Sequence, residues 1–365
     1  MNILIFNWRD PKNPQSGGAE IVTQEHAKAW VQRGHTVTWF TARFTNSPDK
    51  EILEGVTIIR RGNALSVYLF APFYYLFHRK KFDIVIDEIH GLPFFTPLYV
   101  RKPKIAFIHE VAAEIWDYMY PFPINKIGKF IEPLYFRLYT AIPFWVVANS
   151  AVADLKKYGI SSSHCTVINN AISNTVLTQL PVKEKNSTYI FVSRVVKMKG
   201  IEEIIKAFGF IHKEDKNAQL WIVGRGDDEY LHQLKQMVVE YGIEKNVTFF
   251  GNVSQQKKLE LMQRAHILLH ASIKEGWGLV IIEAASQATP AIVYDVSGLR
   301  DSVKDNKTGF ILHENSPREM ATKAVSLIDD KKQYKQFQDN GLAWAKSLTW
   351  KKATEESNKF IMSLV

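Results

Sequence analysis

The chain contains one cysteine, Cys165, among 365 residues. A single cysteine excludes an internal disulfide and any zinc cage built from cysteines. Disulfide frameworks are typical of small secreted proteins, so their absence favours a cytosolic protein. No low-complexity tract and no repeat with a period of about 20 to 50 residues is present, which excludes a solenoid.

Long hydrophobic runs are also absent. The first apolar run, NILIF, soon meets Arg9 and Asp10, without the charged region and cleavage site of a signal peptide. The uncharged stretch ALSVYLFAPFYYLF (residues 64–77) contains Pro72 and is shorter than the roughly 18 residues that a membrane span needs. We therefore expect no transmembrane helix.

The charge is unbalanced toward the positive side, with a formal net charge of +9 at pH 7. Such an excess favours anionic partners, which include nucleotide phosphates, nucleic acid and acidic lipid surfaces. No Lys/Arg-rich arm, zinc finger, RNA-recognition motif or helix-turn-helix signature is present. We therefore do not expect a nucleic-acid partner.

What the sequence does have is an alternation of short apolar runs with longer amphipathic segments. NILIF, HTVTWFTA and PKIAFIH are runs of this kind, and the pattern predicts βα units around a parallel sheet. A polar stretch with a proline, residues 178–188, reads as a linker, and a second series follows it. We expect two doubly wound α/β domains, residues 1–175 and 176–347, with ligands at the carboxyl ends of the strands in a cleft between the halves.

Two loops carry glycine pairs. Gly17 and Gly18 follow the first expected strand, and Gly224 and Gly226 follow the strand WIV of the second half. Glycine lets a backbone approach a phosphate closely, although a plain turn is the alternative at both places. Neither loop has the G-x-G-x-x-G pattern, which weakens the hypothesis of a nicotinamide dehydrogenase.

A basic loop, FVSRVVKMKG (residues 191–200), carries Arg194 and Lys199 from an expected strand to an expected helix. Two long cations and free backbone N–H groups at a helix start suit a diphosphate, and a solvated basic loop is the alternative.

The stretch EGWGLVIIE places Glu275 in a loop and Glu283 in the second turn of a helix expected over residues 278–287. Two carboxylates and the free amides of a helix start could hold a polyol attached to a phosphate. The alternative is that Glu275 is a helix cap and Glu283 an ordinary exposed residue.

Taken together, these stretches resemble the family 4 retaining glycosyltransferases, which have the GT-B architecture of two facing Rossmann-like domains. The resemblance rests on five blocks in the family's order, and it covers nearly the whole chain. The blocks are GGAE (17–20), VVANSAVADLKKYGI with TVINNAIS (146–173), FVSRVVKMKG (191–200), WIVGRGDD (221–228) and EGWGLVIIEAASQATPAIVYDVSGLRDSV (275–303). The chain departs from the family at Asn170–Ala171, where Asn-Gly is usual, and at Ser297, where glycine is common.

The resemblance implies a nucleotide-diphosphate sugar, with a UDP or GDP group, as donor. It implies that Arg194 and Lys199 bind the diphosphate, that Glu275 contacts donor-sugar hydroxyls and that Glu283 contacts the ribose. His109, at the end of the expected strand PKIAFI, matches a histidine beside the reacting centre. Further donor contacts are implied for Gly17, Gly18, Gly224, Asn252, Val253, Gly276, Trp277, Gly278 and Leu279.

The same resemblance implies retention at the anomeric carbon by front-face attack, and no metal or other cofactor. The absence of an Asp-x-Asp motif is consistent with metal independence. Residues 348–365 resemble the family's last helix, which returns to the first domain, so we assign them there.

Aromatic and basic residues are interleaved in two segments of the first half, residues 68–82 and 118–147. Apolar aromatics beside a basic rim can lie in the headgroup layer of an anionic bilayer, and core packing is the alternative. We expect a lipid-linked or polysaccharide acceptor and a location in the cytoplasm or on the inner face of the cell membrane. The rival functions are an inverting transferase or sugar-nucleotide epimerase with the same fold, and a non-catalytic nucleotide-sugar binding protein.

Overall fold

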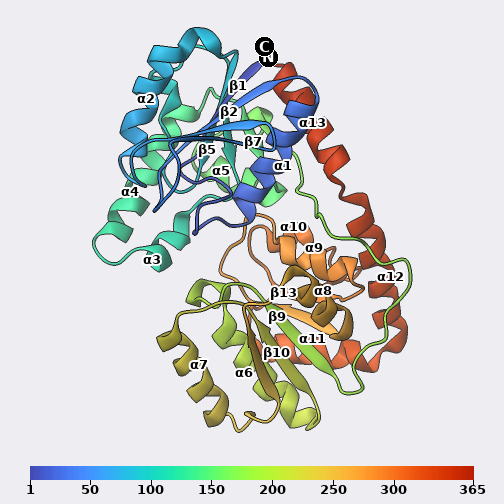
Figure 1. Cartoon of the computed structure of the whole chain (residues 1–365). Coiled ribbons are helices and arrows are strands. Elements are labelled where there is room, and N and C mark those ends of the chain that lie inside the picture. The colour runs from blue at the N-terminus through green and yellow to red at the C-terminus, as the bar shows by residue number, and fades with distance from the viewer. The chain divides into compact units, whose positions relative to one another are not determined.

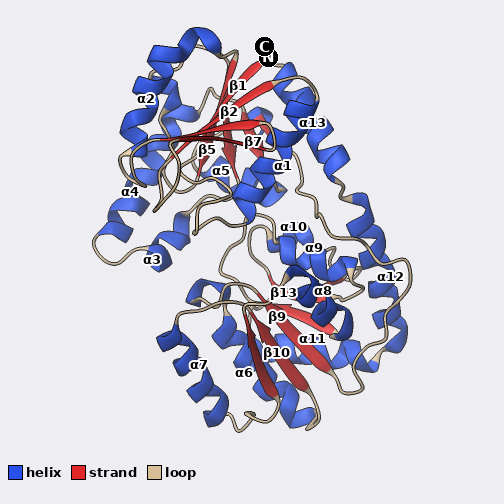
Figure 2. Ribbon diagram, viewed as in Figure 1, coloured by secondary structure: helices blue, strands red, loops and turns tan.

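The computed structural model describes residues 1–365, which form two compact units (Figure 1). Unit 1 consists of Met1–Ala171 and Thr349–Val365, and unit 2 consists of Ile172–Leu348. The sequence-based boundary after residue 175 therefore falls a few residues inside unit 2. Each unit has its own sheet with helices beside it, which confirms the predicted α/β class (Figure 2).

Unit 1 contains an eight-stranded sheet in the order β3-β4-β2-β1-β5-β6-β7-β8, parallel except for the antiparallel pair of β3 and β4. Its strands are β1 (Asn2–Phe6), β2 (Thr36–Thr41), β3 (Lys50–Leu53), β4 (Val56–Arg60), β5 (Ile84–Ile89), β6 (Lys104–Ile108), β7 (Phe144–Val146) and β8 (Cys165–Val167). Its helices are α1 (Gly18–Gln32), α2 (Val67–His78), α3 (Trp116–Met119), α4 (Ile124–Phe136), α5 (Asn149–Lys157) and α13 (Trp350–Met362).

The central strands of unit 1 are apolar runs because both faces of a parallel sheet are covered. All six residues of β5 are buried, and so are the last four residues of β1. The last helix, α13, packs against α1, where Ser357 Oγ lies 2.8 Å from His26 Nδ1 and accepts a hydrogen bond from Trp30 Nε1 at 3.2 Å. The end of the chain is thus an integral part of the first unit.

Unit 2 contains a six-stranded parallel sheet in the order β11-β10-β9-β12-β13-β14. Its strands are β9 (Thr188–Val192), β10 (Gln219–Val223), β11 (Val247–Gly251), β12 (Ile267–His270), β13 (Ala291–Tyr294) and β14 (Gly309–Leu312). Its helices are α6 (Ile201–Glu214), α7 (Asp228–Glu240), α8 (Gln255–Arg264), α9 (Leu279–Ser286), α10 (Leu299–Ser302), α11 (Pro317–Asp329) and α12 (Lys331–Ser347).

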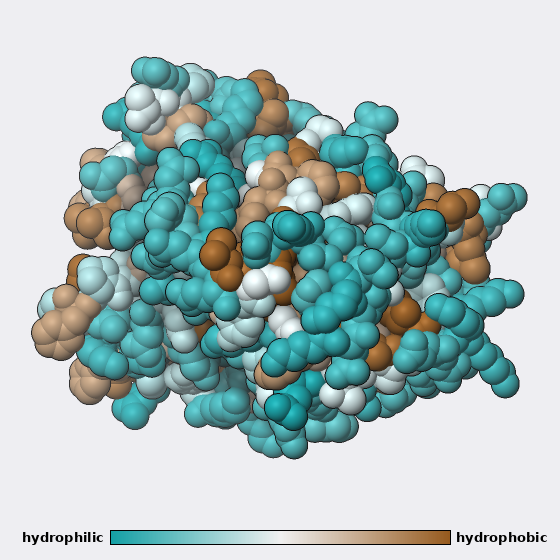
Figure 3. Space-filling model, turned by 90° about the horizontal axis from the view of Figure 1, so that it is seen from below, coloured by the Kyte–Doolittle hydropathy of each residue, from teal (hydrophilic) through white to brown (hydrophobic).

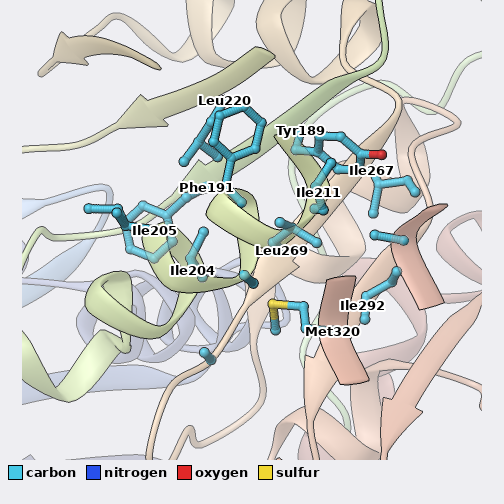
Figure 4. Packing of buried hydrophobic residues seen from close by; sticks show 14 of the residues in the cluster. Tyr189, Phe191, Ile204, Ile205, Ile211, Leu220, Ile267, Leu269, Ile292 and Met320 are labelled. Atoms are coloured by element: carbon cyan, nitrogen blue, oxygen red, sulfur yellow. The ribbon is translucent and has the colours of Figure 1, made fainter. Parts of the chain in front are cut away.

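One face of this sheet forms a large apolar core with α6 and α11 (Figure 4). Phe191 and Leu220 of adjacent strands meet Ile204 and Ile205 of α6 there, and all four side chains are fully buried or nearly so. This core holds the carboxyl ends of β9 and β12, and therefore the loops that follow them, in fixed positions.

The polar stretch 178–188 is not a linker, because it lies within unit 2. Glu184 N donates a hydrogen bond to Arg264 O at 2.9 Å, and Lys183 Nζ donates to Thr289 Oγ1 at 2.8 Å. The stretch is an extended segment, and it forms hydrogen bonds with neighbouring elements of the same unit.

No helix of the described chain combines the length and the apolar character that crossing a bilayer requires.

Candidate functional site

The basic loop of unit 2 connects β9 to α6 through a tight turn. Gly200 has a φ of +68°, and a Cβ atom there would lie 2.0 Å from the carbonyl oxygen of Ala271. Only glycine fits this left-handed position beside another backbone. Arg194 is exposed, and its side chain forms no hydrogen bond or ion pair, whereas Lys199 is buried. Of the two predicted cations of this loop, Arg194 is therefore free and Lys199 is already engaged.

The partner of Lys199 is Glu275, in the loop after β12. Glu275 Oε1 lies 2.6 Å from Lys199 Nζ, 2.7 Å from Ser272 Oγ and 2.9 Å from His270 Nε2. Burial disfavours the carboxylate, but the charge of Lys199 and the hydrogen bond from His270 outweigh it and hold the pKa of Glu275 well below its usual value. Glu275 is therefore a fixed anion in which Oε1 is saturated by three donors.

His270 and Ser272 are residues of this site that the sequence did not single out. The His270 side chain is fully buried, and its second ring nitrogen, Nδ1, has no hydrogen-bond partner. Both residues lie in HASIKE, directly before Glu275, and this proximity is the signal that could have identified them.

The helix expected over residues 278–287 is confirmed as α9, Leu279–Ser286, with Gly278 as its N-cap at a φ of +78°. Glu275 lies in the loop before it, as predicted. Gly298 packs against this loop so tightly that a Cβ atom would lie 2.1 Å from the carbonyl oxygen of Glu275. Trp277 is only 4% exposed, so its ring is packed inside unit 2, and its donor contact stays a prediction.

Glu283 is not the ordinary exposed residue that one alternative allowed. Its side chain is 15% exposed, and Lys258 Nζ on α8 contacts both carboxylate oxygens, at 2.8 and 2.7 Å. Gln255 Nε2 donates a third hydrogen bond to it at 3.2 Å. Lys258 was missed because nothing in the sequence shows that α8 lies beside α9.

The remaining predicted donor residues of unit 2 belong to the turns after β10 and β11. Gly224 is required by packing, because a Cβ atom there would lie 1.7 Å from the carbonyl oxygen of Ser193. Asn252 is exposed and Val253 packs partly against a hydrophobic cluster. Glycine is needed at position 224 because two strand ends approach each other closely there. The donor contacts of Gly224, Asn252 and Val253 stay predictions.

In unit 1, the Gly17–Gly18 loop begins α1. Gly17 N donates a hydrogen bond to Glu20 Oε2 at 2.6 Å, and Arg9 Nε and Nη2 each lie 2.9 Å from Glu20 Oε1. Arg9 follows β1 and was not predicted as a site residue. The buried Glu20 carboxylate thus ties the glycine loop to a cation at the carboxyl edge of the sheet.

His109 lies at the same edge, directly after β6, and it contacts Glu88 of β5. Glu88 Oε1 accepts hydrogen bonds from His90 Nε2 at 2.9 Å, from Thr23 Oγ1 at 2.9 Å and from His109 Nε2 at 3.3 Å. Burial opposes the charge of Glu88, yet the hydrogen bonds from His109 and His90 hold its pKa at about 2. Burial lowers the pKa of His109, whereas Glu88 raises the pKa of His90 in spite of burial.

The ligand atoms of Glu88, His90 and His109 lie within 4.8 Å of one another. Two imidazoles and a carboxylate are ligand types that divalent transition metals accept. Glu88 and His90 were not predicted, although DEIH, which contains both, ends a strand expected from the sequence.

The two units match two family descriptions. Residues 16–175 match "Glycosyltransferase Family 4" and residues 174–344 match "Glycosyl transferases group 1". The chain is 31% identical over 359 residues to an uncharacterized glycosyltransferase of Methanocaldococcus jannaschii, covering 90% of each chain. It is 24% identical over 345 residues to the N-acetyl-alpha-D-glucosaminyl L-malate synthase of Bacillus anthracis, covering 87% of this chain and 86% of that protein.

Several solved structures share the fold. Sucrose-phosphate synthase from Thermosynechococcus elongatus has a TM-score of 0.81 at 18% identity, covering 100% of this chain and 98% of that one. HepE of Anabaena, in complex with UDP and glucose, has a TM-score of 0.74 at 18% identity and full coverage, 100%, of both chains. WaaG, a glycosyltransferase involved in lipopolysaccharide biosynthesis, has a TM-score of 0.75 at 17% identity, covering 98% and 99%. These likenesses confirm the two Rossmann-like units of the GT-B fold.

Proposed function

The chain belongs to glycosyltransferase family 4, and on this premise we propose that it is a retaining hexosyltransferase that uses a UDP- or GDP-sugar as donor. The acceptor is lipid-linked or a polysaccharide, in glycolipid or cell-envelope glycan synthesis. The observation that carries the proposal is the Lys199–Glu275 pair, with its charged atoms 2.6 Å apart, together with the free cation of Arg194 in the loop that carries Lys199.

In the proposed reaction, the bond between the anomeric carbon and the donor diphosphate breaks while the acceptor hydroxyl bonds to the same face of that carbon. The acceptor proton passes to the departing phosphate oxygen. Arg194 and the remaining N–H groups of Lys199 offset the charge that develops on the diphosphate, which is an electrostatic form of catalysis. These cations supply the positive charge, so the proposed reaction needs no divalent metal.

The two glutamates have separate roles in the proposal. The hydrogen bonds from Lys199, Ser272 and His270 all go to Oε1 of Glu275. In the proposal, the other carboxylate oxygen, Oε2, accepts a hydrogen bond from a donor-sugar hydroxyl. Glu283 accepts ribose hydroxyls while Lys258 holds it in place. His109, oriented by Glu88, contacts a sugar hydroxyl or the acceptor. The UDP bound to HepE, a protein of the same fold, supports a uridine donor.

Binding of the donor nucleotide tests the donor part of the proposal. We expect one of UDP and GDP to raise the melting temperature of the wild type, since a ligand at about 100 times its dissociation constant adds about 2.7 kcal/mol of stability. Arg194→Ala should lose this gain. Arg318→Ala, which removes an exposed arginine of α11, should keep it. Stabilisation by NAD alone, or by no nucleotide, would overturn the donor assignment.

Retention is tested on the product. The donor is an α-linked sugar of the nucleotide that raises the melting temperature. The proton NMR coupling at the anomeric centre of the product should show the same configuration as in this donor. An inverted centre would contradict the retaining mechanism and would favour the inverting rival.

A membrane-bound acceptor is supported by two surfaces of unit 1 where large hydrophobic side chains are exposed. On α2, Phe77 is 83% exposed, and the basic residues Arg79–Lys81 follow directly. In the α3–α4 region, Phe122 is 79% and Phe130 72% exposed. Figure 3 shows hydrophobic residues at the left edge of the face it presents, on the side where Figure 1 draws α3 and α4.

The aromatic segment 118–147 contains both buried and exposed aromatic residues. Tyr135, Phe136 and Tyr139 are buried in the core, whereas Phe122 and Phe130 face solvent. Exposed aromatics beside lysines and arginines match the headgroup layer of an anionic bilayer in both polarity and charge.

Vesicle flotation tests this part. We expect the wild type to float with anionic vesicles at low salt, and Phe77→Ser/Phe130→Ser to float several-fold less. The control, Val182→Ser/Val239→Ser, removes two exposed apolar residues of unit 2 and should float like the wild type. Equal flotation of all three proteins, or none, would contradict membrane docking through unit 1.

A further inference from the structure

A cavity of about 470 Å³ lies in unit 1, and it shares no residue with the candidate site. It lies between residues of β1, β2, β3 and β4 on one side and the end of α2 with the turn that follows it on the other. Eleven residues line it: Asn2, Thr36, Thr38, Lys50, Thr57, Ile59, Arg61, Tyr74, His78, Lys81 and Phe82. A volume of this size is in the range of small-molecule sites.

Three threonines lie on the floor of the cavity. Side chains two positions apart on a strand share a face, so Thr36 and Thr38 point to the same side as Phe40, which is buried under α2. Thr57 is paired in register with Thr38 and continues this row of hydroxyls. Thr36 is exposed and Thr38 and Thr57 are half-buried, so their hydroxyl groups are accessible to a ligand in the cavity.

The walls of the cavity carry positive charge and no carboxylate. Lys50, Arg61 and Lys81 line it, and neither lysine forms an ion pair. Arg61 Nη1 lies 3.1 Å from Asp49 Oδ2, but Asp49 also pairs with Arg43 at 2.7 Å, so one carboxylate is shared between two arginines. Asp83 lies outside the lining and accepts hydrogen bonds from Asn2 at 2.7 and 3.4 Å, so the lining itself presents three cations and no carboxylate to a ligand.

The roof consists of aromatic rings that contact one another and the core. The Tyr74 ring stacks on His78 at 4.5 Å and meets the Phe40 ring at 4.7 Å. His78 Nδ1 lies 2.8 Å from Tyr74 O, and because a carbonyl oxygen only accepts, this nitrogen carries the proton. The imidazole is thus fixed in orientation before any ligand enters.

We propose that this cavity binds the phosphate group of a small polyol phosphate, with Lys50, Lys81 and Arg61 holding the phosphate oxygens and the threonine hydroxyls holding the polyol. Phosphate presents several strong acceptors to such donors, and the volume leaves room for the attached polyol. The phosphate comes from a free metabolite or from a lipid headgroup. Phe77, the exposed residue next to His78, makes the second source available at a bilayer surface.

The test uses the full-length protein and glycerol 3-phosphate as probe, with binding measured by isothermal titration calorimetry at low salt. We expect saturable binding, weakened about tenfold or more in Lys50→Gln/Lys81→Gln because two charge-assisted contacts are lost. Thr38→Val keeps the charge and the shape and should also weaken binding. The matched control, Lys80→Gln/Lys102→Gln, removes two exposed lysines outside the cavity and should bind like the wild type.

Vesicles of phosphatidylcholine with phosphatidic acid distinguish the two sources. Competition between these vesicles and glycerol 3-phosphate, lost in Lys50→Gln/Lys81→Gln, assigns the cavity to headgroups as well as free phosphates. Binding of glycerol 3-phosphate alone assigns it to a soluble ligand. Absence of saturable binding of either probe, or equal weakening in both double variants, would overturn the proposal, and circular dichroism of each variant checks that it is folded.

Discussion

At the scale of single residues, the candidate donor site is a set of side chains that hold one another. Glu275 accepts three hydrogen bonds at one oxygen, and the donors come from β12, from the turn after it and from the basic loop. The sequence predicted Lys199 as a contact of the diphosphate and, separately, Glu275 as a contact of the donor sugar. Their contact means that a substitution of either residue changes the position and charge balance of the other.

Glu275→Gln should therefore destabilise unit 2 in addition to impairing the proposed transfer. It leaves the buried ammonium of Lys199 without its carboxylate, and removing one partner of a buried ion pair costs roughly 3 kcal/mol. The measurement is urea unfolding of the free protein. Glu260→Gln, which removes an exposed carboxylate paired with Lys257 and Arg264, is the control and should unfold like the wild type. Equal stability of Glu275→Gln and the wild type would show that the pair does not hold the loop.

At the scale of elements, the loops of unit 2 are fixed by close backbone approaches. The turn into α6 touches the end of β12 at Gly200, and the turn after β10 touches the end of β9 at Gly224. Such contacts leave no space for a side chain. They place Arg194 and Lys199 with little freedom, which is what a binding loop for an anion requires.

Gly200→Ala tests this rigidity. The new Cβ atom would lie 2.0 Å from Ala271 O at a φ of +68°, so clash and backbone strain add, and we expect a loss of at least about 3 kcal/mol in urea unfolding. Gly242→Ala is the matched control, because Gly242 has a φ of +63° and no atom within 4 Å of the added Cβ. It should lose only about 1 kcal/mol, the strain of the left-handed conformation. Equal losses of stability in the two variants would mean that the loop at Gly200 moves to accommodate the added methyl group, and would contradict its rigidity.

A second prediction at this scale concerns Lys183, in the segment 178–188. Burial lowers the pKa of Lys183 to about 7, whereas an unfolded lysine titrates near 10.4. From about pH 7 to about pH 9 the unfolded chain therefore binds more protons at this residue than the folded chain, and its contribution to stability increases as pH rises.

Urea unfolding across this window should show the increase in the wild type and a loss of it in Lys183→Met. Methionine also removes the cost of keeping an ammonium buried, so this variant should be the more stable protein at neutral pH. Lys185→Met, at an exposed neighbouring position, should keep the pH dependence of the wild type. The same pH slope in both variants and the wild type would contradict the assignment of the low pKa to Lys183.

At the scale of the whole molecule, two α/β units carry different chemistry. The predicted site residues, apart from His109, Gly17 and Gly18, lie in unit 2. Unit 1 holds the buried Glu88 with His90 and His109, the exposed aromatics and the cavity next to α2. The His–Glu cluster raises the question of whether a metal takes part.

We expect sugar transfer to be unaffected by prior dialysis against EDTA, since the proposed charge compensation comes from Arg194 and Lys199. The measurement is release of the nucleoside diphosphate from the donor that stabilises the protein, in the presence of a lipid-linked acceptor. Activity that is lost in EDTA and restored by a divalent cation would contradict metal independence. The Glu88→Gln variant would then locate the ion, because only a metal bound at the cluster should be lost with that carboxylate.

The sequence by itself determined the class of fold, the position of α9, the cations of the basic loop and the loop position of Glu275, because these depend on local periodicity, glycine and motif order. Only the tertiary structure decided that Lys199 meets Glu275, that Lys258 holds Glu283, that Glu88 meets His109 and that Trp277 is buried. Each of these contacts joins different elements of a parallel sheet and its helices, or depends on what packs over them. The crossover connections between such elements set no fixed spacing along the chain, so no pattern of residues could have revealed which side chains meet.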